Sequence, residues 1–352
     1  MKTTRVGTLS VGSQSAVHSN YVSGATYVEL SNGKSFGTPQ EWSDAQPSGA
    51  TYDYVGNVVG NGKAGIVEIS QNSNDVYVQT STGSAFNAPA LWTSNFAGTF
   101  NEGGLFDGVA DFTGSGKDDA IVWDPDYMNG EGSFLVGVSK GSSFNVEPWS
   151  YAGTCGCPTG TDAAYYADVT GSGKAALIYV DGGPPAAYTI WVAPSTGSAF
   201  GDFTEWGTQT STLTPEWFAD VTGSGKADAI AIDSNYNVWV ATSNGKTFGS
   251  WKKWFTPSGA IAPQSGYPSG PVAIADVAGS GKAALVYQTY SSDGNRDGPV
   301  YVALSTGSKF STATEWSSTS GLQIAYGGED AEGESVIDVN DDKKADLILQ
   351  VP

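Results

Sequence analysis

Six short turns in this chain place oxygen-bearing side chains at the spacing used by cation-binding loops. They begin at Asn57, Asp111, Asp168, Asp220, Asp276 and Asp338. A loop of the form Asp-x-Asn-x-Asp-Gly-x-x-Asp presents oxygens at positions one, three, five and nine to Ca²⁺. In five of the six turns position five is Ser or Asn, and in three turns position nine is Gly or Ala. Because these turns lack the carboxylates that set affinity, hydrogen bonds can do the structural work of an ion there.

The last turn alone keeps a carboxylate or amide oxygen as ligand at each of the four positions. These ligands are Asp338, Asn340, Asp342 and Asp346. Asp341 and Lys343 stand where the other copies have the two glycines that allow the sharp wrap. Two interpretations stay open, a Ca²⁺ site and a solvated acidic turn. Ca²⁺ is the one cofactor that the sequence suggests.

Aromatic residues that differ between the copies form a second group of candidate functional residues. An exposed Tyr or Trp ring can stack on the apolar C–H face of a pyranose while nearby polar groups hold the hydroxyls. Some of these rings stand three residues before a turn, and others lie in loops. The candidate carbohydrate-binding residues are Tyr54, Tyr127, Tyr165, Trp217, Tyr236 and Tyr290. The alternative role for each is to cover the edge of the hydrophobic core.

Catalytic constellations are scarce. His18 is the single histidine and lies outside the repeats, which argues against Ser-His-Asp hydrolysis and His-rich metal chemistry. Paired carboxylates can cleave glycosides. The nearest acidic clusters are Glu102 with Asp107, and Glu329 with Asp330 and Glu332. We interpret both as solvated loop charges and therefore expect no enzyme activity.

The elements that carry these residues form a repeat. The first five turns are each followed by alternating strands ending in Ser-x-Gly-x-x-Phe, with a Trp five or six residues further on, and one more such segment stands near the start of the chain. Successive turns begin 52 to 62 residues apart. A period of roughly 50 residues made of short strands and tight turns is typical of a β-propeller. With Gly at 47 of 352 residues and charged residues at 15%, the composition also favours turns and strands.

The two chain ends complete one unit. The chain begins with a strand and Trp that lack their turn, Tyr27 to Trp42, and ends with a turn that lacks its strand, Asp338 to Leu349. We predict an all-β, single-domain β-propeller of six four-stranded blades, with seven as the alternative, closed by pairing of the N- and C-terminal strands. Residues 1–23 form an N-terminal extension. The predicted blades span approximately 24–45 with 334–352, 51–95, 105–152, 162–209, 214–257 and 270–319.

Charge and composition limit the partners and the location. The chain has 16 basic and 36 acidic residues, a formal net charge of −20, which disfavours nucleic acid and anionic membranes. No apolar stretch is long enough to span a membrane. Neither a secretory signal nor an Asn-x-Ser/Thr sequon is visible, so unconventional export and a cytoplasmic location both stay open. Cys155 and Cys157 can form a strained local disulfide or two free thiols.

The repeat resembles a known family. The stretch Phe218-Ala-Asp-Val-Thr-Gly-Ser-Gly-Lys-Ala-Asp-Ala-Ile230, followed by Val238-Trp-Val-Ala-Thr-Ser-Asn-Gly-Lys-Thr-Phe248, is similar to an FG-GAP or VCBS repeat, the unit of integrin-type β-propellers. Among stand-alone members, the chain is most similar to the Psathyrella velutina type lectins. The resemblance covers nearly all of the chain from about Gly24 onward. It implies a sugar-binding propeller, although those lectins have seven blades and this chain counts six.

The expected function is carbohydrate binding at several shallow sites between blades, with multivalent recognition of neutral or amino-sugar glycans. Both repeated turns are predicted on one face of the ring. Because loops on a rigid scaffold usually carry binding, the sites are expected on the opposite face, in the connections after each Trp and the loops between second and third strands. An integrin-like protein-binding platform is the alternative, and a carboxylate-based glycoside hydrolase or lyase comes third. The oligomeric state does not follow from the residues.

Overall fold

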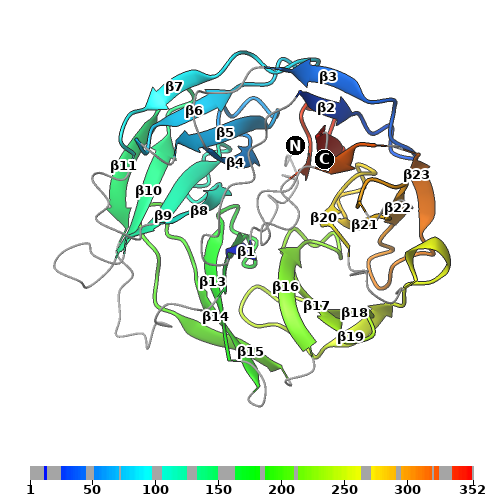
Figure 1. The fold of residues 1–352 in the computed structure, drawn as a ribbon. Helices are drawn as coiled ribbons and strands as arrows, with labels where there is room; N and C mark the ends of the chain where they lie inside the picture. Colours follow the sequence, from blue (N-terminus) through cyan, green and yellow to red (C-terminus); the bar gives the residue numbers. More distant parts are fainter. Residues whose placement is uncertain are drawn as a thin grey trace.

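Strand pairing arranges the chain as six antiparallel sheets around a central axis (Figure 1). This computed structural model describes residues 12–13, 25–44, 51–70, 73–96, 105–124, 133–149, 163–182, 187–209, 213–262, 271–290, 295–318, 321–324 and 335–350. Within these ranges the one helix is a short 3-10 turn, η1 (Gly259–Ile261), and no helix is long and apolar enough to cross a membrane. The prediction of six four-stranded blades is confirmed.

Five blades are each formed by four consecutive strands, which follow one another from the axis of the ring to its rim. The first blade has β4 (Thr51–Gly56), β5 (Gly65–Ser70), β6 (Val76–Gln79) and β7 (Ala90–Thr93). The second has β8 (Leu105–Ala110), β9 (Asp119–Asp124), β10 (Ser133–Ser139) and β11 (Phe144–Trp149). The third has β12 (Ala163–Ala167), β13 (Ala176–Asp181), β14 (Tyr188–Ala193) and β15 (Thr204–Gln209). The fourth has β16 (Leu213–Ala219), β17 (Asp228–Asp233), β18 (Val238–Ala241) and β19 (Lys252–Phe255). The fifth has β20 (Ala273–Ala275), β21 (Ala284–Gln288), β22 (Val300–Ala303) and β23 (Thr314–Ser317).

The sixth blade joins the two ends of the chain and closes the ring. Its outer half is β2 (Thr26–Glu29) and β3 (Gln40–Ser43), and its inner half is β26 (Asp346–Gln350) with the short strands β24 (Gln323–Ile324) and β25 (Val336–Ile337). Tyr27 of β2 pairs with Leu349 of β26 in an antiparallel register. The predicted closure by N- and C-terminal strands is therefore confirmed. A further strand, β1 (Gly12–Ser13), pairs with β12 of the third blade.

The repeated aromatic residues pack the blades against one another. The Trp of each blade meets the Phe of the next blade, with ring centroids 5.2 to 5.7 Å apart. The last of these pairs, Trp316 with Phe36, joins the fifth blade to the sixth. Tilted and edge-to-face arrangements at these distances add to the free energy gained by burial. The same contact repeated at all six blade interfaces makes the ring a rigid scaffold.

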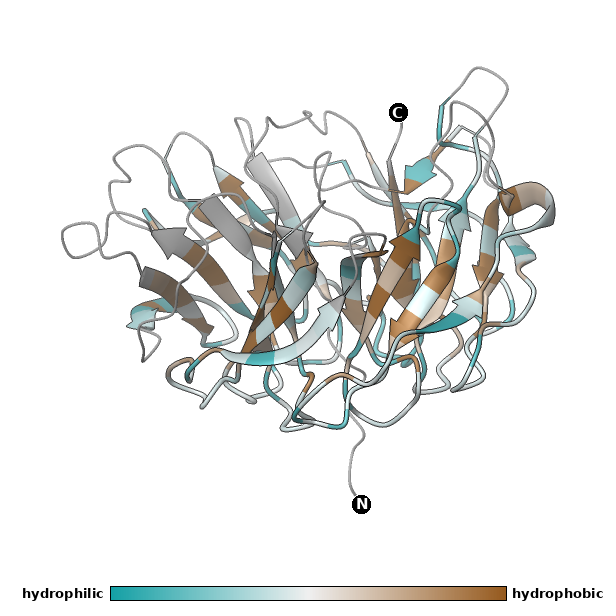
Figure 2. Cartoon of the chain, turned by 90° about the horizontal axis from the view of Figure 1, so that it is seen from below, coloured by the Kyte–Doolittle hydropathy of each residue, from teal (hydrophilic) through white to brown (hydrophobic). Residues whose placement is uncertain are grey.

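The two kinds of repeated turn lie together on one side of the disc, the lower side in Figure 2. One kind joins the inner strand of a blade to the second strand, and the Ser-x-Gly kind joins the third strand to the outer one. We call this side the turn face and the opposite side the loop face. The sequence predicted this separation, because turns that join alternate strand pairs of a meander must fall at the same end of the sheet.

Candidate functional site

The first side chain of each turn on the turn face is satisfied within its own loop. The carboxylate of Asp220 accepts N–H groups from Gly223 at 2.7 Å, from Ser224 at 3.1 Å and from Gly225 at 2.6 Å. Comparable bonds form at the other copies, including Asn57. Backbone N–H groups thus compensate the carboxylate charge that a cation would otherwise compensate.

The acidic residue at position nine links the two kinds of turn. Asp228 is fully buried, and one of its oxygens accepts the N–H of Ser243 at 2.8 Å while the other accepts the N–H of Val221 at 3.2 Å. Asp119 and Asp346 occupy equivalent positions. Burial raises the pKa of Asp228 to about 6 and that of Asp346 to about 7, against the opposing effect of these N–H donors. The carboxylate therefore has a structural partner at each oxygen.

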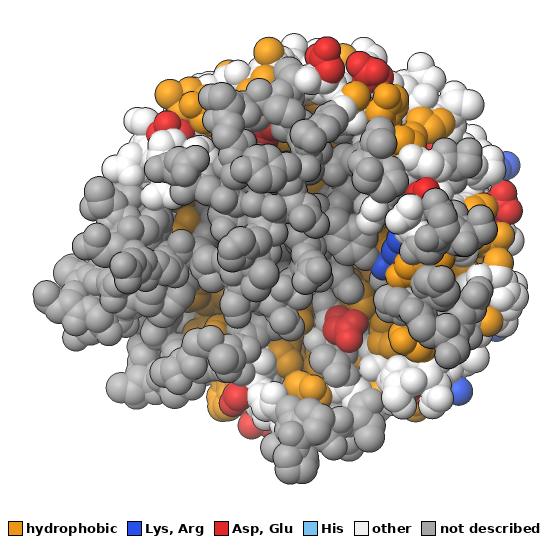
Figure 3. All heavy atoms as spheres, viewed as in Figure 1, with side chains coloured by type: hydrophobic (Ala, Val, Ile, Leu, Met, Phe, Trp, Pro, Cys, Tyr) orange, Lys and Arg blue, Asp and Glu red, His pale blue; other side chains and the backbone are white. Residues whose placement is uncertain are grey.

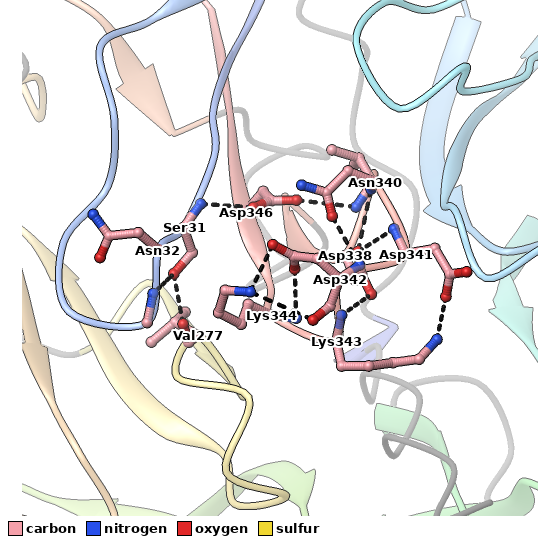
Figure 4. A network of polar contacts seen from close by, with 12 residues as sticks. Ser31, Asn32, Val277, Asp338, Asn340, Asp341, Asp342, Lys343, Lys344 and Asp346 are labelled. Atoms are coloured by element: carbon pink, nitrogen blue, oxygen red, sulfur yellow. Dashed lines mark hydrogen bonds and ion pairs between the residues drawn. The ribbon is translucent and has the colours of Figure 1, made fainter.

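The last turn keeps the wrap of the other copies without their glycines. Asp341 and Lys343 adopt positive φ angles of 67° and 69°. Figure 4 shows the predicted ligands Asp338, Asn340, Asp342 and Asp346 in one network of polar contacts. The fully buried Asp346 faces Ser31, whose N–H it accepts at 2.7 Å.

Each carboxylate of the last turn already has a donor in this arrangement. Asp342 forms an ion pair with Lys344 at 2.7 Å, and Asp341 pairs with Lys343. Among the described residues no three His, Cys, Asp or Glu side chains are grouped as they would be around a metal ion. To bind here, Ca²⁺ would have to displace these donors from the carboxylates, in particular Lys344 from Asp342. Ca²⁺ at this turn stays a prediction.

A second set of hydrogen bonds joins each turn to the next blade. The Ser243 hydroxyl donates to the carbonyl of Val169 at 2.6 Å, and the N–H of Ala227 donates to the carbonyl of Asp168 at 2.8 Å. The serine bond recurs from Ser31, Ser81, Ser139, Ser195 and Ser305. The backbone bond also recurs at every blade interface, including Ala64 to Asp338 across the closing blade. The constant residues of the turn face therefore fasten the ring together.

The loop face carries the segments that differ between blades, and three of them are held by side chains. Each links the end of the second strand, or the loop between the second and third strands, to the connection that follows the Trp. In the first blade Asp75 accepts the N–H of Asn95 at 2.9 Å. In the fourth blade Thr256 donates to Asn237 at 2.8 Å. In the fifth, buried Gln288 accepts the N–H of Ile324 at 2.9 Å. Figure 3 shows this face, with hydrophobic and charged side chains of the described residues spaced around the ring.

Tyr236 lies in the hairpin loop between β17 and β18, which is ordered by one carboxylate. Asp233 accepts the N–H groups of Asn235 at 2.9 Å and of Asn237 at 3.0 Å, and it accepts the indole N–H of Trp239 at 3.0 Å. Burial opposes ionisation of Asp233, but these bonds outweigh it and lower the pKa of this carboxyl. Tyr236 has a φ of 61° and is half-buried. The network thus fixes the backbone that presents the Tyr236 ring.

Tyr290 follows β21 and forms a pair with a charged residue. The Arg296 guanidinium carbon lies 5.6 Å from the centre of the Tyr290 ring, within the range of a cation–π contact. Arg296 also donates from Nε to the carbonyl of Gln288 at 3.3 Å. Since Gln288 anchors the neighbouring segment, Tyr290 and Arg296 are attached to a fixed part of the blade.

The other predicted rings lie deeper or outside the described residues. Tyr165 and Trp217 are 6% and 3% exposed, and the Tyr165 hydroxyl donates to the carbonyl of Pro215 at 3.2 Å in the neighbouring blade. Their burial favours a packing role. Tyr54 is half-buried against the core between the first two blades. Tyr127 lies outside the described residues, as do Cys155 and Cys157. The described candidates are thus spread over four blades.

Two features of the loop face were not predicted from the sequence. Trp239 stands at a position on the third strand where other blades also carry an aromatic residue, yet its indole N–H donates to Asp233 and its ring is half-buried. The run Asp233-Ser-Asn-Tyr-Asn237 could have indicated this, because Asp and Asn side chains commonly bond backbone N–H groups two residues on. The second feature is Arg296, one of only two arginines in the chain with Arg5, whose contact with Tyr290 no sequence pattern indicated.

Comparison with solved structures finds the same architecture along almost the whole chain. An Agrocybe aegerita lectin, described for specific recognition of non-reducing terminal N-acetylglucosamine, superposes with a TM-score of 0.56 and 22% identity, over 98% of this chain and 85% of that chain. A chain of the Photorhabdus luminescens Tc holotoxin pore superposes with a TM-score of 0.56 and 17% identity, over 93% of this chain and 15% of that chain. At these identities the comparisons show the fold alone.

Comparison of the sequence itself gives no match. No family model and no curated protein matches the chain. The resemblance to FG-GAP or VCBS repeats therefore rests on the residues that carry it. By its fold the chain is a six-bladed β-propeller, and it is similar in structure to a lectin.

Proposed function

We propose that this protein is a lectin that binds carbohydrate through its loop face. The observation that carries the proposal is the similarity of the complete ring, over 98% of the chain, to a lectin chain described as recognising terminal N-acetylglucosamine. Because 22% identity does not carry a specificity across, the proposed ligand class is wider: glycans built from neutral or amino sugars. A net charge of −20 agrees with this class, since anionic polysaccharides would be repelled.

The proposed contacts are aromatic rings held by ordered loops. Tyr236 and Tyr290 are half-buried, and each is fixed by the polar contacts described above. A sugar stacked on either ring would find amide, hydroxyl and charged groups within the same loop, including Asn235 and Arg296. Such a site is shallow and binds weakly. Sites on several blades would together bind a displayed glycan by avidity, with gains of about 10² to 10⁴ where the geometry allows.

We assign no catalytic role to the protein. The similarity to a lectin and the single histidine both favour a binding protein over an enzyme. A protein-binding platform, the alternative on the same fold, is distinguished by hapten inhibition. Simple sugars should abolish cell agglutination by a lectin and leave a protein–protein contact intact.

Calorimetric titration with N-acetylglucosamine-terminated oligosaccharides tests the sites. Tyr236→Ala and Tyr290→Ala should each weaken one site by about five- to tenfold, since a stacked ring contributes on the order of 1 kcal/mol. In a multi-site protein this loss is seen as a lower binding stoichiometry. Tyr236→Phe keeps the ring and should bind as the unchanged protein does.

The matched control is Tyr301→Phe, which removes a hydroxyl that donates to Glu315 on the rim of the disc. It should leave the titration unchanged. Sugar binding that survives both alanine variants with full stoichiometry would show that these two residues are not the sites while leaving the lectin proposal intact.

A further inference from the structure

The outer strand of every blade is an edge, because in the described residues β3, β7, β11, β15, β19 and β23 each end their sheet. An edge strand presents unpaired N–H and C=O groups to which another strand can pair. Proteins commonly block such pairing with charged side chains on the edge. Five of these six strands carry a charged residue, at Glu41, Glu147, Glu205, Lys252 with Lys253, and Glu315. Strand β7, with the sequence Ala-Leu-Trp-Thr, carries none.

The difference falls at one register position. In four blades a charged residue on the outer strand lies opposite an aromatic residue on the third strand: Tyr27 with Glu41, Trp191 with Glu205, Trp239 with Lys253, and Tyr301 with Glu315. In the first blade the same position pairs Tyr77 with Leu91. Leu91 of the first blade therefore stands where four other blades have a charged residue on the edge strand.

The side chains around β7 are exposed as well as uncharged. Leu91 is 53% exposed, the most exposed large hydrophobic side chain among the described residues. Trp92 is half-buried, whereas the equivalent Trp42, Trp149, Trp206, Trp254 and Trp316 are between 1% and 8% exposed. No residue from Val76 to Asn101 is charged, in a chain whose formal net charge is −20. The first blade thus has an apolar and electrically neutral rim.

We propose that β7 pairs with the β7 strand of a second copy of this chain, forming a two-fold symmetric dimer of propellers. Two copies carry like net charge and repel one another at most of their surface. The rim of the first blade is where they can approach edge to edge without bringing charged side chains of the outer strands together. An antiparallel pair of identical strands is self-complementary, which is the condition for a closed two-fold interface.

The dimer joins the two first blades into one continuous sheet. Side chains alternate across β7, so Leu91 and Tyr77 cover one face of the joint while Ala90 and Trp92 cover the other. The strand has four residues, so the interface is small and the complex is a weak one of the transient class. Dimerisation should strengthen with added salt, because salt screens the repulsion between the two acidic copies. An interface built on ion pairs would weaken instead.

Sedimentation velocity of the full chain from low micromolar to millimolar concentration tests this. The unchanged protein should show a reversible dimer whose dissociation constant falls as salt is raised. Leu91→Glu restores the residue type of the other rims and places like charges near the two-fold axis, and it should raise the dissociation constant by about tenfold or more. Ala90→Glu charges the other face of the strand and should act in the same direction.

Two controls separate this edge from the others. Glu315→Gln removes the charge at the same register of the fifth blade and should leave the dissociation constant unchanged. Hydrogen exchange should show concentration-dependent protection of the amides in Asn87–Asn95 and none in Thr312–Ser317. A protein that stays monomeric at millimolar concentration overturns the proposal. So does a dimer that both glutamate variants leave intact, or one whose protection lies on another edge.

Discussion

At the scale of single residues, the same residue type has different roles according to its neighbours. Asp228 and Asp233 stand at the two ends of β17, yet one is buried and links two turns while the other orders a loop on the opposite face. The sequence predicted oxygen-rich turns correctly. It also indicated that hydrogen bonds can replace an ion in these turns, but it could not show which donors meet the carboxylate at position nine, because the partner of Asp228 at Ser243 comes from a different hairpin of the blade.

Glu29 predicts a pH dependence of stability. It is fully buried, and neither oxygen of its carboxyl group has a hydrogen-bond partner among the described residues. Burial raises its pKa from 4.5 to about 7, and the nearby Ser317 side chain offsets this only in part. A carboxyl whose pKa is higher in the folded state stabilises the fold below its unfolded pKa, and this stabilisation is lost as pH rises through the folded pKa. The free energy of unfolding should therefore fall between about pH 4.5 and pH 7 because of this residue.

The Glu29→Gln variant isolates that contribution. Gln79 occupies the same place in the first blade, where its amide oxygen accepts a hydrogen bond from Ser43 at 2.8 Å and its amide nitrogen donates to Glu68 at 3.0 Å, so an amide is accommodated at this register position. In urea unfolding the variant should be more stable than the unchanged protein by about 3 kcal/mol at most near pH 8, and equally stable near pH 4. Glu315→Gln, at an exposed glutamate, is the control. If the difference in unfolding free energy between Glu29→Gln and the unchanged protein were the same at pH 4 and pH 8, this role of Glu29 would be contradicted.

At the scale of elements, the turns are built to touch the next blade. Gly223 and Gly225 belong to one turn and have positive φ angles of 77° and 75°. A Cβ added at Gly223 would lie 3.0 Å from Cγ of Lys282 in the following blade, whereas one added at Gly225 would meet nothing within 4 Å. The pair therefore separates backbone conformation from contact between blades.

Both alanine variants should be destabilised by about 1 kcal/mol because a positive φ is unfavourable for any residue with a Cβ. Gly223→Ala should lose more, since the Lys282 stem must also move. Thermal or urea unfolding of the two variants measures the difference directly. Equal losses would show that the lysine adapts at no cost and that this contact does not help hold the blades together.

The last turn carries the Ca²⁺ prediction. Binding would displace Lys344 from Asp342 and would gain the carboxylates of Asp338 and Asp346. We expect a weak site, for which millimolar Ca²⁺ raises the melting temperature by a few degrees relative to chelator. Asp342→Asn should remove that rise. A melting temperature that does not respond to Ca²⁺ in the unchanged protein would exclude the site at this concentration.

The elements also show how far the sequence could lead. The period, the Trp and Phe positions and the two half-units predicted the blade number, the closure and the separation of the faces. Those features follow from the local turns and from the alternation of apolar and polar residues in the strands, and both patterns recur in each copy of the repeat. The burial of Trp217 and Tyr165 could not be predicted in this way, because it depends on the neighbouring blade. The same limit applies to Leu91. Its exposure on an uncharged edge is recognised only when the outer strands of all six blades are compared in the structure.

At the scale of the whole molecule, the ring has two faces with different roles. The turn face holds the residues that the six copies share, and their hydrogen bonds and ring contacts join blade to blade around the axis. The loop face holds what the copies do not share, including the ordered loops that present Tyr236 and Tyr290. Variation is tolerated on the loop face because the turn face and the aromatic pairs already hold the ring together.

The claim that the loop face binds carbohydrate is tested most directly by screening the purified protein on a broad glycan array and soaking crystals with the best ligand. We predict binding to glycans that end in neutral or amino sugars, with the sugar seen on the loop face against the loops of the fourth or fifth blade. No binding across the array, or a sugar found only on the turn face, would contradict the claim.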